Sequence, residues 1–560
     1  MPSMIKRPCD EGVVRSTEAE SPCAPKAGPW VLAATILGTS MAFIDETAVT
    51  VVLPTIQWGL GATAVDAQWV VEIYTLLLAS LILVGGSLGD HLGRRRVFAV
   101  GIGLFAAASA WCALASSPEQ LILARAVQGV GGALLVPNSL AIIGASFAEK
   151  QRGKAIGTWA GFTSVTMTLG PVLGGYLAEN VSWRGVFFII VPLAVVVLAV
   201  AFSRVPESRD PEAGSLDLPG AALAAVGLGG VVLGLLESSR LGLGAPLVLS
   251  SLAIGAAALV AFVVVEGRSQ EPMMPLSLFR SRNFAGANAF TLFLYFALGG
   301  TLFFLPFNLV QVQGYSVTAA GAAFVPTILL IFLLSRYSGG LADRFGVRLP
   351  LVVGPAIAAV GFALFALPGT NSGSYWTTFF PTAVVLGIGL SILVPAVTTV
   401  ALNSVEDKHS GLASAINNAF SQAAGLLAIA VLGVLMFAAF GASLDGRLST
   451  LDLPPEAKQQ LEAEKIKLGG AEVPDSIDAA LGTTVEQAID EAFVSGYRVV
   501  MLVATALALA SALSAALLIE GKKKRARRAN VESVASAALT PLDAGSPAEK
   551  HQEVEDAVSS

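Results

Sequence analysis

Long apolar segments alternate with short polar ones along most of this chain. Each apolar segment has about twenty residues and few charges, which suits a helix that crosses the hydrocarbon core of a bilayer. The segments are too long and too little alternating for barrel strands, and lipid offers no partner to an open strand edge. The pattern predicts an all-α polytopic membrane protein with about fourteen transmembrane helices, at residues 30–55, 67–88, 97–115, 120–143, 155–178, 185–203, 218–236, 246–265, 284–311, 318–341, 350–368, 376–402, 411–438 and 494–519.

The pattern G-x-L-x-D-x-x-G-x-R occurs twice, at residues 86–95 and 339–348. It follows the second and the tenth apolar segments. Two matches at equivalent helix ends indicate an internal duplication, which is the signature of a transporter built from two similar halves. Counted from this motif, the seventh and eighth helices are an extra pair inserted between two six-helix bundles.

The expected organisation therefore has five parts along the chain. They are a disordered cytoplasmic tail (1–28), an N-terminal six-helix bundle (29–204), an inserted helix pair with flanking cytoplasmic loops (205–283), a C-terminal six-helix bundle (284–520) that includes a long extracellular loop (439–493), and a disordered cytoplasmic tail (521–560). The first tail lacks the apolar core and the small-residue cleavage site of a signal peptide.

Basic residues gather on one side of the predicted membrane. The loops after the second, fourth, sixth, eighth and tenth helices contain Lys or Arg, as in "HLGRRR" and "EKQRGK", whereas loops on the other side, such as "ASSPEQ" and "VQVQGYS", contain none. The positive-inside rule places the basic side, and with it both termini, in the cytoplasm. The acidic loop 439–493 then lies outside, either as a solvated linker or as a small cap that attracts substrate.

The amino-acid composition agrees with this architecture and argues against a large soluble domain and against a nucleic-acid-binding protein. Hydrophobic residues make up 54% and charged residues 13% of the 560 residues, so the lipid bilayer is the expected environment and no large soluble domain fits. The net charge is -6, and one short basic run, "GKKKRARR", does not indicate nucleic-acid binding. Cys9, Cys23 and Cys112 form neither a disulfide framework nor a metal-ligand pattern.

Six further motifs occur in order along the chain: "FIDETAVTVVLP" (43–54), "WVVEIYTL" (69–76), "RAVQGVGGA" (125–133), "GPVLGG" (170–175), "SWRGVFFIIVP" (182–192) and "GLASAINNAFSQAAG" (411–425). On these motifs the chain resembles the fourteen-helix drug:proton antiporter branch (QacA/EmrB-like) of the major facilitator superfamily. The resemblance implies a proton-coupled multidrug exporter of small amphipathic or cationic compounds in a bacterial inner (plasma) membrane, with the proton gradient as energy source and no bound cofactor. Thr50 and Thr166 depart from the Asn and Gly that are usual in the branch.

Charged residues inside the predicted spans are few, and each is costly unless it is paired or hydrated. Asp45, Glu72 and Arg125 fall in one slab of the outer half, about 8–15 Å below the surface at about 1.5 Å of rise per residue. Adjacent helical residues point about 100° apart, so Asp45 and Glu46 cannot both face one partner, and the resemblance favours Asp45. We expect Asp45 and Glu72 to bind the proton and part of the substrate in turn, with Arg125 as counter-charge. The structural alternative is a pair that only fixes helix packing.

The repeated motif is expected to act as a conformational latch at the cytoplasmic helix ends. Its glycines allow close helix approach, and its aspartate accepts hydrogen bonds from an arginine or a helix N-terminus. The alternative for the arginines is a positive-inside anchor. The latch residues are Gly86, Asp90, Gly93, Arg94, Asp343 and Gly346.

The fifth helix carries the antiporter motif that the resemblance assigns, Gly170, Pro171, Gly174 and Gly175. Its proline bends the helix and its glycines thin it, so we expect a close contact with another helix there. The second half holds no carboxylate between residues 284 and 342, which concentrates proton chemistry in the first half. The Phe-rich ninth helix, with Asn288, Asn308, Gln311 and Gln313, is either a wall for amphipathic ligands or lipid-facing filler.

Other functions fit the sequence less well. A membrane-embedded enzyme would need a catalytic or metal cluster, yet the three histidines lie in predicted loops and tails, and no nucleotide-binding loop occurs. A passive channel would need a repeated selectivity filter. An exporter of an endogenous metabolite, peptide or siderophore remains the alternative to multidrug efflux. The oligomeric state and, in a Gram-negative host, a periplasmic adaptor stay open.

Overall fold

The computed structural model describes residues 27–147, 149–210, 217–269, 272–370, 373–402, 410–474 and 476–520. Most of the predicted tail 1–28 and all of the tail 521–560 lie outside these ranges. Within them the chain forms helices and connecting turns without a strand. The helices of the first half are α2 (Gly28–Leu60), α3 (Ala64–Leu92), α4 (Arg94–Leu114), α5 (Pro118–Ser146), α6 (Glu149–Asn180), α7 (Gly185–Phe188) and α8 (Ile190–Arg204).

The inserted pair is α9 (Leu218–Leu241) and α10 (Pro246–Glu266). The second half comprises η1 (Leu276–Arg280), α11 (Arg282–Phe307), η2 (Asn308–Val312), α12 (Val317–Ala322), α13 (Val325–Phe345), α14 (Arg348–Phe365), α15 (Tyr375–Leu402), α16 (Ser410–Leu448), α17 (Pro455–Glu464), η4 (Lys465–Gly470) and α18 (Ala479–Leu518).

The number of membrane-crossing helices agrees with the expectation from the sequence. Of the described residues, 13 helical segments are long and apolar enough to cross a membrane. The helix α6 is not among them because Gly and Thr lower its hydropathy, but it has 32 residues and packs lengthwise against α2. With α6 the helices that run through the bundle match the predicted fourteen, and the all-α polytopic fold is confirmed.

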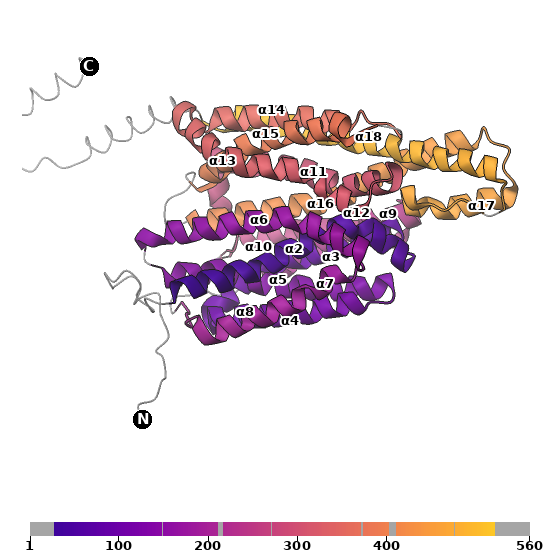
Figure 1. Ribbon diagram of the computed structural model, residues 1–560. Helices are drawn as coiled ribbons and strands as arrows, with labels where there is room; N and C mark the ends of the chain where they lie inside the picture. The colour runs from indigo at the N-terminus through magenta and orange to yellow at the C-terminus, as the bar shows by residue number, and fades with distance from the viewer. Residues whose placement is uncertain are drawn as a thin grey trace, which may run out of the picture.

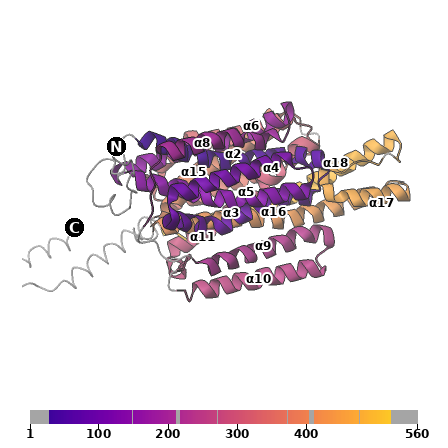
Figure 2. The same ribbon diagram turned by 90° about the horizontal axis from the view of Figure 1, so that it is seen from below.

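The helices run roughly parallel to one another in a single elongated bundle (Figure 1). The end at which α2 begins and α18 finishes is called the tail end, and the opposite end, where α17 lies, is called the cap end. The helices α2 to α8 pack mainly on one another, as do α11 and α13 to α18, whereas α12 packs mainly on α6 of the first half. The pair α9 and α10 lies along one edge (Figure 2), where α9 contacts both α3 and α16.

The two halves touch each other at the cap end. The Gln311 amide after α11 donates to the Gln57 side-chain oxygen of α2 (3.0 Å), and the Gln57 amide donates to the Lys467 carbonyl (3.1 Å). The Gln68 amide of α3 lies 3.5 Å from the Ile429 carbonyl of α16. These hydrogen bonds hold the halves together on the side away from the tail end.

The loop expected at 439–493 is shorter than the sequence indicated. The helix α16 continues to Leu448 and α18 begins at Ala479, so both helices extend beyond the apolar runs and enclose α17 and η4. The reason is an amphipathic pattern in the extensions: Leu444, Leu448, Val485 and Ile489 are buried in one core with Leu461 of α17. The segment is a packed cap rather than an unstructured linker.

Candidate functional site

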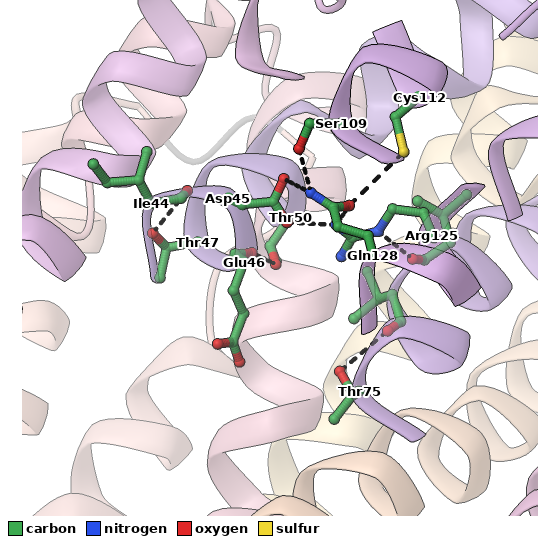
Figure 3. Close-up of polar contacts among 12 residues, drawn as sticks. Ile44, Asp45, Glu46, Thr47, Thr50, Thr75, Ser109, Cys112, Arg125 and Gln128 are labelled. Atoms are coloured by element: carbon green, nitrogen blue, oxygen red, sulfur yellow. Dashed lines mark hydrogen bonds and ion pairs between the residues drawn. The ribbon is translucent and has the colours of Figure 1, made fainter. Parts of the chain in front are cut away.

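Asp45 of α2 and Arg125 of α5 form a buried ion pair in the middle of the first half (Figure 3). Asp45 is 0% exposed and Arg125 is 1% exposed. A guanidinium nitrogen donates to one carboxylate oxygen, and the Gln128 amide donates to the other at 2.9 Å. Both oxygens of Asp45 are therefore satisfied. Breaking this pair would leave an uncompensated charge in a buried site.

Polar groups from three helices complete the shell around Arg125. Its Nε donates to the Val70 carbonyl of α3 (3.0 Å), and its guanidinium carbon lies 4.2 Å from the centre of the Tyr74 ring. The Gln128 side chain joins the network because its oxygen accepts from Arg125 (2.6 Å) and its amide donates to the Ser109 hydroxyl of α4 (2.8 Å). The ion pair is thus fixed by α2, α3, α4 and α5 together.

Sequence reasoning placed Asp45 and Arg125 correctly but missed Gln128, Ser109 and Tyr74. Asp45, and not Glu46, faces Arg125, and Figure 3 shows the Glu46 carboxylate directed away from the network. The available signal was Gln128 itself, a polar residue in the apolar run that begins at Arg125. Gln128 comes three positions after Arg125, which puts the two on one face of a helix.

Glu72 does not join the pair, although it was expected at the same depth. It is 0% exposed, and neither carboxyl oxygen has a hydrogen-bond partner among the described residues. The Val70 carbonyl and the Tyr74 ring, which face Arg125, lie on another side of α3. Glu72 therefore lies apart from Asp45 and Arg125 despite its similar depth, because depth along a helix does not fix the direction of a side chain around it.

The first copy of the repeated motif forms a compact corner at the tail end. The Arg94 Nε donates to Asp90 at 2.8 Å, and Gly93 between α3 and α4 has φ +109°. The segment after α8 closes over this corner, since the Asp210 amide donates to the Asp90 carbonyl (3.0 Å) and Arg95 pairs with Glu207 (3.5 Å). The corner ties α3, α4 and the chain leaving α8 within the first half.

The close approach at this corner uses other glycines than the predicted Gly86. A Cβ added at Gly85 would collide with the Ala133 carbonyl, and one at Gly89 with the Asn138 amide oxygen, whereas one at Gly86 would make ordinary contact with Pro137. The Asn138 amide donates to the Gly85 carbonyl (2.8 Å). The tight crossing of α3 and α5 therefore uses Gly85, which directly precedes the repeated pattern, and Gly89, which occupies one of its variable positions.

The second copy repeats the backbone corner. Gly346 follows α13 with φ +83°, as Gly93 follows α3, and Arg348 donates to the Ala516 carbonyl. A positive φ costs glycine little, which explains a glycine at this position in both copies. The Asp343 side chain lies outside the part of the structure that is described.

The antiporter motif of α6 makes two different contacts. Gly170 and Gly174 pack on α2, where an added Cβ would collide with Thr47 or approach Ala48 to 2.7 Å. Gly175 faces the second half, because its Cβ would lie 2.5 Å from the Val317 carbonyl at the start of α12. The Pro171 carbonyl lies against Gly321 of α12. The motif therefore joins α6 to α2 within the first half through Gly170 and Gly174, and to α12 of the second half through Pro171 and Gly175.

Comparison with known proteins decides the family. The sequence profile of the Major Facilitator Superfamily matches residues 35–429. The chain belongs to this superfamily. A tetracenomycin C resistance and export protein of Streptomyces glaucescens is 31% identical over 88% of this chain and 92% of its own length. The multidrug resistance protein Stp of Mycobacterium tuberculosis (strain CDC 1551 / Oshkosh) is 32% identical over 85% of this chain and 89% of its own.

Solved structures agree on the fold of this superfamily member. A bacterial homolog of the human lysosomal transporter Spinster, in an inward-facing and unoccupied conformation, superimposes with a TM-score of 0.61 at 19% identity. The match covers 88% of this chain and 98% of the other. The resemblance read from the sequence motifs is confirmed at the level of the superfamily, and the relatives named above are resistance and export proteins.

In this superfamily member the ninth predicted helix is part of the core. Phe303, Phe304 and Phe307 are at most 2% exposed, and Phe303 lies 4.9 Å from Phe304 between ring centres. For these three rings the lipid-facing alternative is wrong. The Asn417 amide of α16 donates to Thr291 of α11 at 2.9 Å, so this helix also contacts α16 through polar groups.

No cluster of three or more His, Cys, Asp or Glu side chains that could hold a metal ion is found among the described residues.

Replacing Gly175 by leucine is expected to slow transport strongly. The larger side chain cannot fit beside the Val317 carbonyl, so α6 and α12 must separate and the cap-end contact weakens. Overpacking of this kind costs about 1–3 kcal/mol, which corresponds to a loss of about five- to 150-fold. The initial rate of ethidium efflux, normalised to the amount of protein in the membrane, measures the effect.

Gly157 on the same helix provides the matched control, because an added Cβ there meets no atom within 4 Å. G157L should keep the wild-type rate. A wild-type rate in G175L would contradict the assignment of this glycine to the contact between the halves.

Proposed function

We propose that this protein exports small amphipathic or cationic compounds in exchange for protons, as a multidrug efflux transporter. Its cap end would face the outside and both termini the cytoplasm of a bacterial cell, as the basic loops indicate. The resistance and export functions named for its relatives support the export part. The observation that carries the proton part is the buried pair of Asp45 and Arg125.

The pair offers a simple way to exchange a proton for a cation. With Asp45 ionised, its charge and that of Arg125 cancel, and the site is neutral. When a proton binds Asp45, the carboxylate charge disappears and Arg125 is left as an uncompensated cation in a medium of low dielectric constant. That charge repels a cationic substrate over several ångströms. Proton binding and cation binding would therefore exclude each other.

The contacts at the two ends supply the conformational part. The cap-end hydrogen bonds of Gln57 and the packing of Gly175 would hold the outer side closed in the arrangement described here. Export requires a second arrangement in which these contacts part and the tail ends approach. The Asp90–Arg94 corner would then act as the predicted latch by presenting a fixed surface of the first half on which the second half closes.

One contact between the halves would respond to pH at the outer surface. Glu179, at the cap end of α6, accepts the Thr318 backbone N–H of α12 at 3.1 Å. Its contacts with the Thr318 side chain and backbone N–H lower the pKa of Glu179. Its contribution is therefore present above the ordinary carboxyl pKa and is lost as the pH falls through the lowered value. At neutral pH this contact would favour the closed outer side.

An endogenous natural product is the second candidate cargo. The relative from Streptomyces glaucescens is a tetracenomycin C resistance and export protein, so resistance and export of one compound coexist in a similar chain. The buried network of Asp45 does not distinguish the two cargo classes, because the partners described for it are groups of the protein on α2 to α5.

Reconstitution into liposomes tests the proposed function. Liposomes that contain wild-type protein receive ethidium, and the pH on the cap side is set two units below the pH on the tail side. One proton exchanged for one monovalent cation supplies about 2.7 kcal/mol, or about a hundredfold accumulation of ethidium on the cap side. Accumulation that does not depend on the pH difference would reject proton coupling, and absence of ethidium movement with active export of a natural product would favour the second candidate.

A further inference from the structure

Glu72 of α3 is a buried acid that the network of Asp45 and Arg125 leaves unused. It is fully buried, and its two carboxyl oxygens have no partner in the described part of the chain. An ionised carboxylate without hydrogen bonds or a counter-charge is strongly disfavoured in apolar surroundings relative to the neutral acid. The packing around Glu72 therefore favours a carboxyl group that carries its proton.

The neighbours of Glu72 on α3 place it where three helices meet. One turn toward the cap end, Gln68 contacts the Ile429 carbonyl of α16. One turn toward the tail end, Leu76 lies 3.2 Å from a Cβ placed on Gly229 of α9. Residues four apart share a face of a helix, so Glu72 faces the junction of α3, α9 and α16. We call this junction the lateral seam.

The lateral seam is apolar and joins all three parts of the molecule. The helix α3 belongs to the first half, α9 to the inserted pair and α16 to the second half (Figure 2). A cluster of buried side chains fills the seam, consisting of Val65, Leu76, Val232, Leu236, Leu426 and Ala430. Because the seam includes both halves, any movement of one half against the other must change its packing.

Charged groups on the surrounding helices are engaged elsewhere. On α9, Glu237 accepts from the Trp69 indole (3.2 Å) and lies 3.9 Å from Arg240. On α5, across α3, Arg125 is bonded to Asp45. The α16 residues of the seam cluster are apolar. The two lysines of η4, which also packs on α3, pair with acids of the cap: Lys465 with Asp445 and Glu462, and Lys467 with Glu464. In the described residues these cations are therefore engaged away from Glu72, and a proton can neutralise it in the packed seam.

We propose that Glu72 must bind a proton before the lateral seam can close at the cap end, so that the inserted helix α9 makes closure of the outer side depend on external acidity. In the arrangement open at the cap end, water reaches Glu72 and its O–H bond forms with a proton from the outside. The neutral acid is then buried as α16 returns to α3. Opening reverses the step and returns the proton to water. The inference rests on the proposed function, which supplies the orientation and the use of protons.

The distance between the halves at the cap end, measured as a function of pH, tests this inference without requiring transport. Spin labels are placed at the exposed positions Glu119 on α5 and Trp376 on α15, with the natural cysteines replaced. A closure that takes up one proton changes the open-to-closed ratio by up to about tenfold per pH unit. The label distance should therefore lengthen from pH 5 to pH 9, and E72Q, which resembles the neutral acid, should lower the slope by about one proton.

E237Q is the matched control, because it changes the other acid at the edge of the seam and should keep the wild-type slope. The inference is overturned if E72Q has the wild-type slope, or if the wild-type distance does not change with pH. It is also overturned if E72Q unfolds at a lower temperature than wild type at pH 5, because a neutral isostere should fit the seam. Ethidium accumulation in the same wild-type liposomes separately shows whether the proposed function holds.

Discussion

Replacing Asp45 by asparagine should reduce the gradient-driven accumulation of ethidium from about a hundredfold to about equal concentrations on both sides. Asparagine has nearly the size and shape of aspartate and can still accept from Arg125, but it cannot bind and release a proton. Because Asp45 is fully buried within the first half, no water-exposed acid replaces it in the network. The measurement is the steady-state ratio in liposomes with a pH difference of two units.

D452N is the control for this substitution, because Asp452 is exposed in the cap and has no place in the network. It should accumulate ethidium as wild type does. The amount of D45N protein in the membrane must also be equal to wild type. If D45N still concentrated ethidium in response to the gradient, Asp45 would be a structural residue and the coupling would lie elsewhere.

Replacing Arg125 by alanine should destabilise the protein more than any other single change in the network. The substitution leaves the Asp45 carboxylate buried without its counter-charge, and it also frees the Val70 carbonyl and the Gln128 oxygen. Loss of one partner of a buried pair costs about 3–5 kcal/mol. The free energy of unfolding in detergent, or the thermal midpoint as its proxy, measures the loss.

The double variant D45N/R125A distinguishes the charge effect from loss of packing. It removes the uncompensated carboxylate, so it should be more stable than R125A alone by at least about 1 kcal/mol. R125K should fall between wild type and R125A, because lysine keeps the charge but lacks the planar fork that reaches Asp45, Gln128 and Val70 together. Equal stability of R125A and wild type would show that the pair is solvated in the working protein.

The sequence predicted helices well and side-chain directions around them less well. Apolar length alone placed the third helix at 97–115, and α4 spans Arg94–Leu114. It could not place Glu72, because rise along the helix gives depth while the packing of α9 and α16 against α3 determines which face is enclosed. The pairing of Asp45 with Arg125 was accessible because charges in apolar spans are rare and must find partners.

The cap and the glycine contacts show a second limit of sequence reasoning. Hydropathy ended the thirteenth helix near residue 438, although α16 continues for two to three more turns on an amphipathic pattern that a search for apolar runs does not detect. The repeated motif pointed to Gly86, whereas the tight contacts occur at Gly85 and Gly89. The spacing of the motif predicts where the corner between α3 and α4 lies. Which glycines allow α3 and α5 to cross closely depends on the side chains and backbone of α5 opposite them.

The inserted pair is attached to the two bundles through α9, which leaves the amino-acid sequence of α10 free to change. The helix α10 packs chiefly against α9, and 22% of the residues in its apolar window are buried. Its close crossing with α9 depends on Gly230 and Gly255, which face each other. Much of the remaining surface of α10 is exposed and would meet lipid in a bilayer, so most of its positions can exchange one aliphatic side chain for another at little cost. The sequence of α10 is thus expected to differ most among relatives, while the two six-helix bundles keep their packing.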